Sequence, residues 1–255
     1  MIGRWFSFTN LNGAIMDALT LIIDYLFSEM YLRAAGMTLL LTVVAMFFGM
    51  LAGLVIAVIQ ETGNKQLNYI VTTYIWFFRG TPALFQIIFI YNVLPEFGIN
   101  LSSFMSGALA LALHEGAYVS EIMRAGLQSV GKGQRNAARS VGMKEWQVMR
   151  HIILPQAIRV IIPPIGNQFI GMLKLSALVS VVAVEELLLV ANQAASSNFL
   201  YLEALTAAGI YYLVFTTIFM YIQGHIEHWA NGGYRPKTLV ENAPDTKLIG
   251  RTEAR

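Results

Sequence analysis

Two long runs without a charged residue constrain this chain more than any other feature. Residues 37–59 form 23 consecutive uncharged positions, and residues 204–224 form another 21. A helix needs about 20 mostly apolar residues to cross the ~30 Å hydrocarbon core of a bilayer. Charged residues make up 13% of the chain, about half of the share that a soluble domain carries. The sequence therefore predicts an all-α integral membrane protein.

Five membrane-spanning helices are expected, and one of them carries a break. Pro82, in the stretch RGTP at residues 79–82, removes a helical hydrogen bond and restricts the residue before it. An arginine at the centre of a bilayer costs about 2.5–3.5 kcal/mol, so we expect a helix break near Arg79, close to a membrane interface or facing protein, with the span beginning around there. The spans are expected at about residues 34–60, 67–94, 104–128, 158–183 and 203–227.

The first expected span and the segment before it have different patterns. Ala45, Gly49, Gly53 and Ala57 recur every fourth residue in the span. They form a smooth ridge of the kind that lets helices in lipid approach closely. Residues 14–30 instead combine an apolar helical face with two aspartates on another face. That pattern predicts an amphipathic helix lying in the membrane interface.

Basic residues set the expected orientation. Residues 124–159 contain seven Lys or Arg and one acid, and residues 231–255 add five more bases, whereas 94–103 and 184–203 contain acids only. Lys and Arg stay on the cytoplasmic side, so five spans place the N-terminus outside and the C-terminus inside. The expected domains are a periplasmic or interfacial segment (1–33), a transmembrane domain (34–230) with a cytoplasmic loop (129–156), and a cytoplasmic tail (231–255).

The basic loop has features that charge alone does not explain. Gly142 divides an amphipathic stretch over residues 136–149, and its conformational freedom predicts two short helices hinged there. Trp146 is expected to be buried, and Pro155 is expected to end the second helix and begin the next span. The pattern favours an element that docks on a partner. An ordinary basic loop that only fixes orientation is the alternative.

The same loop carries a recognisable motif. The stretch NAARSVG at residues 136–142 is followed by nine residues and then by IILP at 152–155. This spacing resembles the EAA motif of ABC importer permeases, in which Glu-Ala-Ala and Gly precede Ile-x-Leu-Pro. Asn136 stands where that family has Glu, which removes one charge contact to the partner. Four other stretches resemble the polar amino acid uptake subfamily, the histidine, glutamine and arginine permease type: FRGTP at 78–82, AYVSEIMRAG at 117–126, GQ at 133–134 and KLSALVSVV at 174–182.

The resemblance implies a permease subunit of an ATP-driven, binding-protein-dependent importer of polar amino acids or related solutes. Its fold would be the type I ABC importer permease fold, with a cytoplasmic coupling helix between the third and fourth spans. In that family the helix docks on a separate ATPase. The residues implied in coupling are Asn136, Ala137, Ala138, Gly142, Trp146, Ile152, Leu154 and Pro155.

The implied partners complete this picture. ATP and Mg²⁺ would be bound by the ATPase subunits, so this chain is expected to hold no cofactor. A second permease subunit, identical or related, and a periplasmic or extracellular solute-binding protein are also implied. Membrane lipid surrounds the chain in a bacterial inner membrane. The binding protein is expected to dock on the acidic 184–203 loop and the N-terminal helix, with Asn192, Gln193 and Asn198 as contacts or as solvated loop residues.

The chain itself lacks the motifs for ATP chemistry. The stretch GKGQRN at 131–136 does not have the order of residues of a phosphate-binding loop. The sequence contains no cysteine, which leaves no thiolate for a metal site. No catalytic residue, metal site or nucleic-acid partner is predicted, so we expect a transport subunit and not an enzyme.

Ionisable residues inside the expected spans predict a transport path, because such residues normally face protein or a cavity. On the third span, Glu121 either lines the path or pairs with Arg124. Glu115 either binds a cationic or amino group of the solute or is a buried carboxylate. On the fourth span, Lys174 either attracts a solute carboxylate or pairs with one of these two acids. The candidate path residues are His114, Glu115, Tyr118, Glu121, Asn167, Lys174 and Ser176, the last of which could instead bond back to its own helix.

Two other classes of protein stay open. Ion-gradient-driven secondary transporters of amino acids usually contain two repeats, into which five spans do not divide. A non-transporting membrane assembly subunit explains the spans but not the charges inside them.

Overall fold

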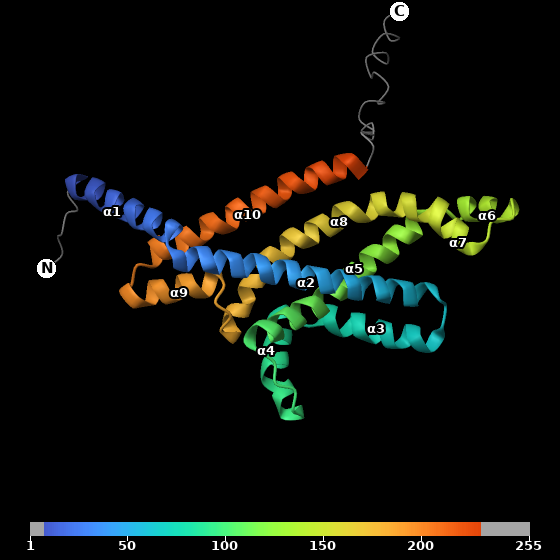
Figure 1. Cartoon of the computed structure of the whole chain (residues 1–255), viewed down its shortest axis with the longest axis horizontal. Coiled ribbons are helices and arrows are strands. Elements are labelled where there is room, and N and C mark those ends of the chain that lie inside the picture. The colour runs from blue at the N-terminus through green and yellow to red at the C-terminus, as the bar shows by residue number, and fades with distance from the viewer. Residues whose placement is uncertain (1–7, 231–255) are drawn as a thin grey trace, which may run out of the picture.

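The computed structural model describes residues 8–230, without the side chains of residues 8–12 and 14, and in this range the regular structure is helical. Helices α2, α8 and α10 run along the long axis, with α6 and α7 at one end and α1 and α9 at the other (Figure 1). The α-helices are α1 (Phe8–Phe27), α2 (Glu29–Glu61), α3 (Lys65–Gly80), α4 (Ala83–Val93), α5 (Ser103–Ser129), α6 (Lys132–Ser140), α7 (Glu145–Val148), α8 (Leu154–Leu175), α9 (Leu187–Asn198) and α10 (Tyr201–Ala230). Shorter 3₁₀ turns cover Leu94–Phe97 and Ser176–Val182, and a π-turn covers Met149–Ile153.

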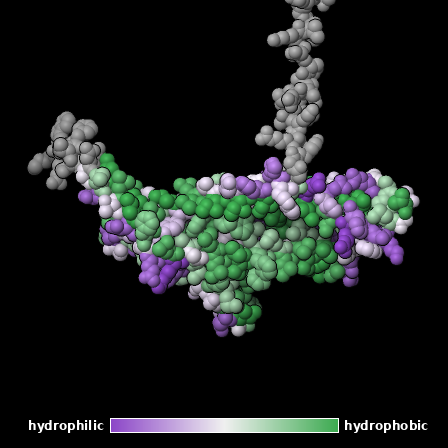
Figure 2. Space-filling view, turned by 45° about the horizontal axis from the view of Figure 1, so that its top comes forward, coloured by the Kyte–Doolittle hydropathy of each residue, from purple (hydrophilic) through white to green (hydrophobic). Residues whose placement is uncertain are grey.

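Long apolar helices dominate the described part of the chain. Three continuous runs are long and apolar enough to cross a membrane: Glu29–Glu61, Glu145–Val182 and Tyr201–Ala230. The bent pair Lys65–Gly80 and Ala83–Phe97 qualifies as a fourth when it is taken as one span. Helix α5 matches the third expected span in extent, but it is not among these runs because His114 and Glu115 make its centre more polar. Figure 2 shows apolar side chains covering the middle of the molecule and polar ones gathered toward its ends.

The ridge of small residues packs against α5, which confirms the predicted close approach of helices at this ridge. Gly49 faces the side chain of Glu115, and a Cβ built on Gly53 would lie 2.6 Å from Cγ1 of Val119. Ala45 and Ala57 on the same face are buried. The two helices therefore approach so closely that no side chain fits between them at the two glycines.

The predicted break in the second apolar region is confirmed. Helix α3 ends at Gly80, Thr81 is extended, and α4 begins at Ala83 after a bend of 108°. Gln86 holds the bend, because its Nε2 donates to the carbonyl oxygens of Phe78 at 2.9 Å and Thr81 at 3.1 Å. The break thus leaves these two backbone groups with a partner inside the protein, as a non-helical segment at membrane depth requires.

Two boundary predictions are wrong. Pro155 does not end a helix: α7 continues through the π-turn into α8, and the amide of Leu154 donates to the carbonyl of Met149. The wider π-turn accommodates the ring and the missing N–H of proline. The expected acidic loop at 184–203 is largely the helix α9. Glu186, far from being a surface acid, is fully buried, and its carboxylate accepts hydrogen bonds from the amides of Leu188 and Leu189 at the start of α9.

Candidate functional site

The hinged segment between α5 and α8 is a helical hairpin, which we call the α6–α7 hairpin (residues 132–148). Gly142 lies in the turn between α6 and α7 with a φ of +81°, a conformation that favours glycine. The predicted pair of short helices hinged at Gly142 is therefore confirmed. Across the turn, Arg139 donates from Nε to Glu145 at 2.6 Å and from Nη2 at 3.0 Å. The hydrogen bonds from Arg139 lower the pKa of the Glu145 carboxyl, so the ion pair is charged at neutral pH.

A small apolar core fixes the hairpin to the ends of α5 and α8. Ala138 of α6 and Val148 of α7 are buried against Val130, Ile153 and Ala157. Of the motif residues, Ala138 points into this core and Ile152 packs against it. The hairpin is thus joined by packing to the two long helices that flank it, so a force on the hairpin reaches both helices.

The opposite face of the hairpin exposes apolar side chains. Val141 is 77% exposed and Trp146 is 58% exposed, so the expectation that Trp146 is buried is wrong for the single chain. Asn136, Ala137 and Gly142 are also exposed, as are the remaining motif residues Leu154 and Pro155. An exposed tryptophan and an exposed valine on one basic hairpin favour a surface that a partner protein covers.

A polar depression lies beside the motif position that departs from the family pattern. Asn136 lines it together with Glu61 at the end of α2 and Arg135 of α6. Arg135 approaches Glu61 at 4.0 Å, and its Nη2 donates to the carbonyl of Leu127 at 3.2 Å. The hairpin is therefore also tied to the end of α2.

Polar candidate residues of α5 meet the broken pair α3–α4. His114 is buried, and its Nδ1 lies 3.1 Å from Oε1 of Gln86. Because Nε2 of Gln86 is the donor to the break, its Oε1 is the acceptor, which places the proton of His114 on Nδ1. Sequence reasoning did not assign this pair, since Gln86 and His114 become neighbours only through the bend.

Arg79 is a further residue that sequence reasoning did not place in the site. Its Nη1 donates to Glu121 at 3.3 Å, and its guanidinium carbon lies 5.4 Å from the centre of the Tyr118 ring. Glu121 also accepts two hydrogen bonds of 3.0 Å from Arg124. The expected pairing of Glu121 with Arg124 is confirmed, and Arg79 joins it from another helix.

Glu115 and Lys174 are not brought together. Glu115 is 2% exposed, beside Gly49, and its Oε1 has no hydrogen-bond partner within residues 8–230. Lys174 is exposed. No ion pair joins it to Glu115 or Glu121 in the described structure. The alternative in which Lys174 pairs with one of these two acids is therefore wrong. The two groups lie on different helices, one exposed and the other buried.

The remaining path candidates have local partners. Ser176 is fully buried and donates to the carbonyl of Leu173 at 2.7 Å, so it bonds back to its own helix. Asn167 accepts a hydrogen bond of 3.3 Å from Nε2 of Gln223 in α10. The same nitrogen donates to the carbonyl of Pro163 at 3.2 Å, in the middle of α8 where two consecutive prolines interrupt the helical hydrogen bonds.

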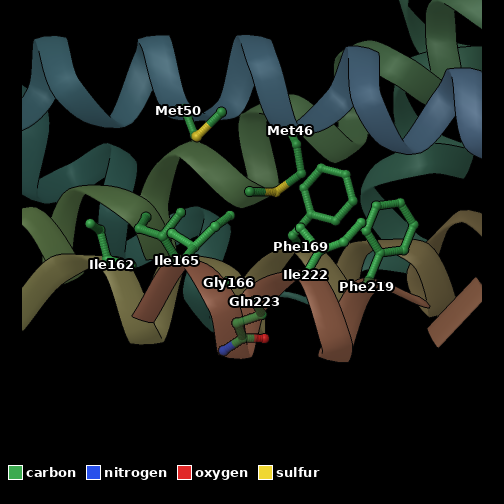
Figure 3. Close-up of a pocket in the computed structure, with 10 residues that line it drawn as sticks. Met46, Met50, Ile162, Ile165, Gly166, Phe169, Phe219, Ile222 and Gln223 are labelled. Atoms are coloured by element: carbon green, nitrogen blue, oxygen red, sulfur yellow. The ribbon is translucent and has the colours of Figure 1, made fainter. Parts of the chain in front are cut away.

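A cavity of about 290 Å³ between α2, α8 and α10 is lined almost entirely by apolar side chains. Figure 3 shows Met46 and Met50 of α2 facing Ile165 and Phe169 of α8, with Phe219 from α10. None of the candidate path residues lines this cavity. A charged solute would lose its hydration there without gaining a partner, so we do not assign the cavity to a polar solute. In the described range, no group of three or more His, Asp or Glu side chains is arranged to hold a metal ion.

Long apolar helices, ionisable side chains between them and an exposed hairpin joined to two of the helices define a multi-span membrane transport component. The chain belongs to the family of binding-protein-dependent transport system inner membrane components, whose family model matches residues 45–231. The resemblance found in the sequence is thereby confirmed.

Named relatives and solved structures agree with this assignment. The chain is 40% identical over 188 residues to the probable glutamine ABC transporter permease protein GlnM of Bacillus subtilis, covering 74% of this chain and 87% of the relative. It is 36% identical over 236 residues to the arginine transport system permease protein ArgU of Corynebacterium glutamicum, covering 86% of this chain and 74% of the relative. A crystal structure of an amino acid ABC transporter with histidines matches with a TM-score of 0.75 at 40% identity, over 79% of this chain and 94% of the other. The MetNI methionine ABC transporter in an inward-facing conformation matches with a TM-score of 0.69 at 18% identity, over 80% and 99%, which shows a shared fold.

Proposed function

We propose that this chain is the transmembrane permease subunit of an ATP-driven, binding-protein-dependent importer of polar amino acids or closely related solutes. The observation that carries the proposal is the α6–α7 hairpin, which exposes Val141 and Trp146 while its other face packs on the ends of α5 and α8. Such a hairpin transmits motion from a partner to the spans. The similarity to glutamine and arginine permease proteins supports the solute class.

The proposed topology has five spans, with the N-terminus outside and the C-terminus inside. The bent pair α3–α4 serves as the second span and α5 as the third, whose polar residues then face protein or the path and not lipid. The seven bases in residues 124–159 support a cytoplasmic position for the hairpin. The basic tail over residues 231–255, also assigned to the cytoplasm, lies outside the described residues.

The proposed assembly contains two permease subunits, identical or related, above two ATPase subunits that bind ATP and Mg²⁺. A solute-binding protein delivers the amino acid at the outer end, where Arg33 of α2 pairs with Glu29 and Glu185 lies nearby in the same depression. Asn192 and Gln193 of α9 are exposed, and we propose that they contact the solute-binding protein. Asn198 instead donates to the hydroxyl of Tyr25 at 2.8 Å and ties α9 to α1.

Reconstitution tests this function. Uptake of an amino acid into proteoliposomes is expected to require the ATPase, hydrolysable ATP and the solute-binding protein. It should continue when an ionophore collapses proton and sodium gradients. Uptake by this chain alone, driven by an ion gradient, would identify a secondary transporter and overturn the proposal. A complex that assembles but transports no amino acid would favour an assembly subunit.

Glu115 provides a more specific test of the path. A buried carboxylate without a cationic partner would be completed by a cationic side chain of the solute. We expect Glu115→Gln to reduce uptake of L-arginine several-fold more than uptake of L-glutamine, measured with the matching binding proteins. Glu227→Gln is the control, since it makes the same chemical change at a carboxylate of α10 that is not a candidate path residue and that accepts a hydrogen bond from Gln223; it should leave the ratio of the two uptake rates unchanged. Equal losses for the two solutes would assign Glu115 to helix packing.

A further inference from the structure

Arg79 is a cation that the fold positions without neutralising it. Its single hydrogen bond to protein in the described structure is the 3.3 Å contact from Nη1 to Glu121, although a guanidinium carries five N–H donors. The face of the Tyr118 ring supports the guanidinium at 5.4 Å. Arg79 also lies in the last turn of α3, where the helix dipole favours a positive charge. Most of its donors are therefore available to a ligand.

Glu121 does not use up this charge, because Arg124 is its principal partner. Both Nε and Nη2 of Arg124 donate to Glu121 at 3.0 Å, which is the bidentate geometry of strong arginine–carboxylate pairs. The cluster of Arg79, Glu121 and Arg124 thus contains two cations and one anion, and its net charge is +1. The Arg79 side chain is 44% exposed, so the surplus charge faces outward from the single chain.

The surplus positive charge lies at membrane depth. Arg79 comes 14 residues after Lys65 in α3, which corresponds to about 21 Å along the helix axis. With Lys65 at the cytoplasmic surface, Arg79 lies inside the ~30 Å hydrocarbon core. A cation at this depth requires water or an anionic partner. The cluster therefore belongs to a surface that lines a polar path.

We propose that Arg79 binds the α-carboxylate of the amino acid during its passage through the permease. This inference rests on the proposed importer function. It goes further by naming the chemical group of the solute, the α-carboxylate, that the permease binds. Arginine binds a carboxylate through two parallel hydrogen bonds, and the free donors of Arg79 supply them. Every α-amino acid carries this carboxylate, so the site accepts the whole class and leaves discrimination between side chains to other residues.

The test compares amino acids with analogues that lack the carboxylate. L-Arginine, L-glutamine and their α-amides are titrated onto the purified permease–ATPase complex without the solute-binding protein, because that protein would impose its own selectivity. We expect the wild-type complex to bind the acids about 10- to 100-fold more tightly than the amides, as a charge-assisted hydrogen bond predicts. Arg79→Gln should remove this preference, and Arg79→Lys should retain part of it.

A matched variant separates this role from a general effect of charge. Arg33→Gln removes an arginine that has its own partner, Glu29, near the other end of the molecule, and it should keep the wild-type preference. The inference is contradicted if Arg79→Gln keeps the preference for acids over amides, or loses affinity for both equally. It is also contradicted if the wild-type complex transports but shows no such preference or no binding. Should Arg79→Gln not assemble with the ATPase, Arg79→Lys is used instead: a reduced preference for acids over amides supports the inference, and an unchanged preference contradicts it. Absence of ATP-driven uptake by the wild-type complex would instead contradict the proposed function.

Discussion

Gly142→Asp is expected to abolish coupling to the ATPase while the permease stays folded. A side chain at position 142 meets nothing within 4 Å in this chain, and aspartate is one of the residues that best tolerates the positive φ of this turn. We expect the ATPase surface to tolerate it poorly, because a carboxylate would enter the proposed apolar contact with Val141 and Trp146. A lost contact of this kind weakens association by about 30-fold or more. ATPase co-purification and substrate-stimulated ATP hydrolysis should both fall accordingly.

The chain offers a close control for this substitution. Gly63, in the connection between α2 and α3, also has a positive φ of +70° and nothing within 4 Å. Gly63→Asp therefore adds the same charge, in the same backbone conformation, outside the α6–α7 hairpin, and it should couple normally. Trp146→Asp should reproduce the effect of Gly142→Asp. Normal transport by Gly142→Asp, or an equal loss in Gly63→Asp, would remove the docking role from the hairpin.

Gly53→Ala is expected to destabilise the permease itself. Its Cβ would lie 2.6 Å from Cγ1 of Val119 and 3.0 Å from the backbone nitrogen of Ser120. Because the second contact is with backbone, α2 and α5 must move apart. Overpacking of this kind costs about 1–3 kcal/mol. The variant should unfold at a lower temperature or denaturant concentration in detergent, measured on the purified complex.

A second glycine of the same helix serves as the control. Gly36 is exposed, and a Cβ there meets nothing within 4 Å. Gly36→Ala should leave stability unchanged or raise it by up to about 1 kcal/mol through helix propensity. If Gly53→Ala is as stable as Gly36→Ala, the close approach of α2 and α5 is wrong.

Features that depend on regular spacing could be predicted from the sequence. The four-residue repeat that contains Gly49 and Gly53 predicts which face of the first span packs closely. Gly142 predicts the hinge, and Pro82 predicts the break, because both act on the backbone within one turn. The presence of the long helices follows in the same way from the lengths of the apolar runs, although their ends differ by several residues from the expected ones, as at Glu29 of α2 and Leu175 of α8. The resemblance to the family motif supplied the proposed partner of the hairpin, which no residue pattern alone would identify.

Features that depend on a bend or on distant partners could not be predicted. Arg79 reaches Glu121 because α3 and α5 pack together, 42 positions apart in the sequence. Glu186 has the sequence context of a surface acid, but Tyr212 of α10 donates to it at 2.8 Å and makes its burial possible. The π-turn before Pro155 depends on how α7 packs against the core of the hairpin. Local residue propensities contain no information about this packing.

The side of the membrane on which the α6–α7 hairpin lies is the most direct test of the account. The chain has no cysteine, so Lys144→Cys, at an exposed position of the hairpin, introduces a single site for a membrane-impermeant maleimide. The account predicts labelling in inside-out vesicles, protection of the site when the ATPase is bound, and no labelling of intact cells from outside. Labelling from the external face would contradict the topology and the coupling role together.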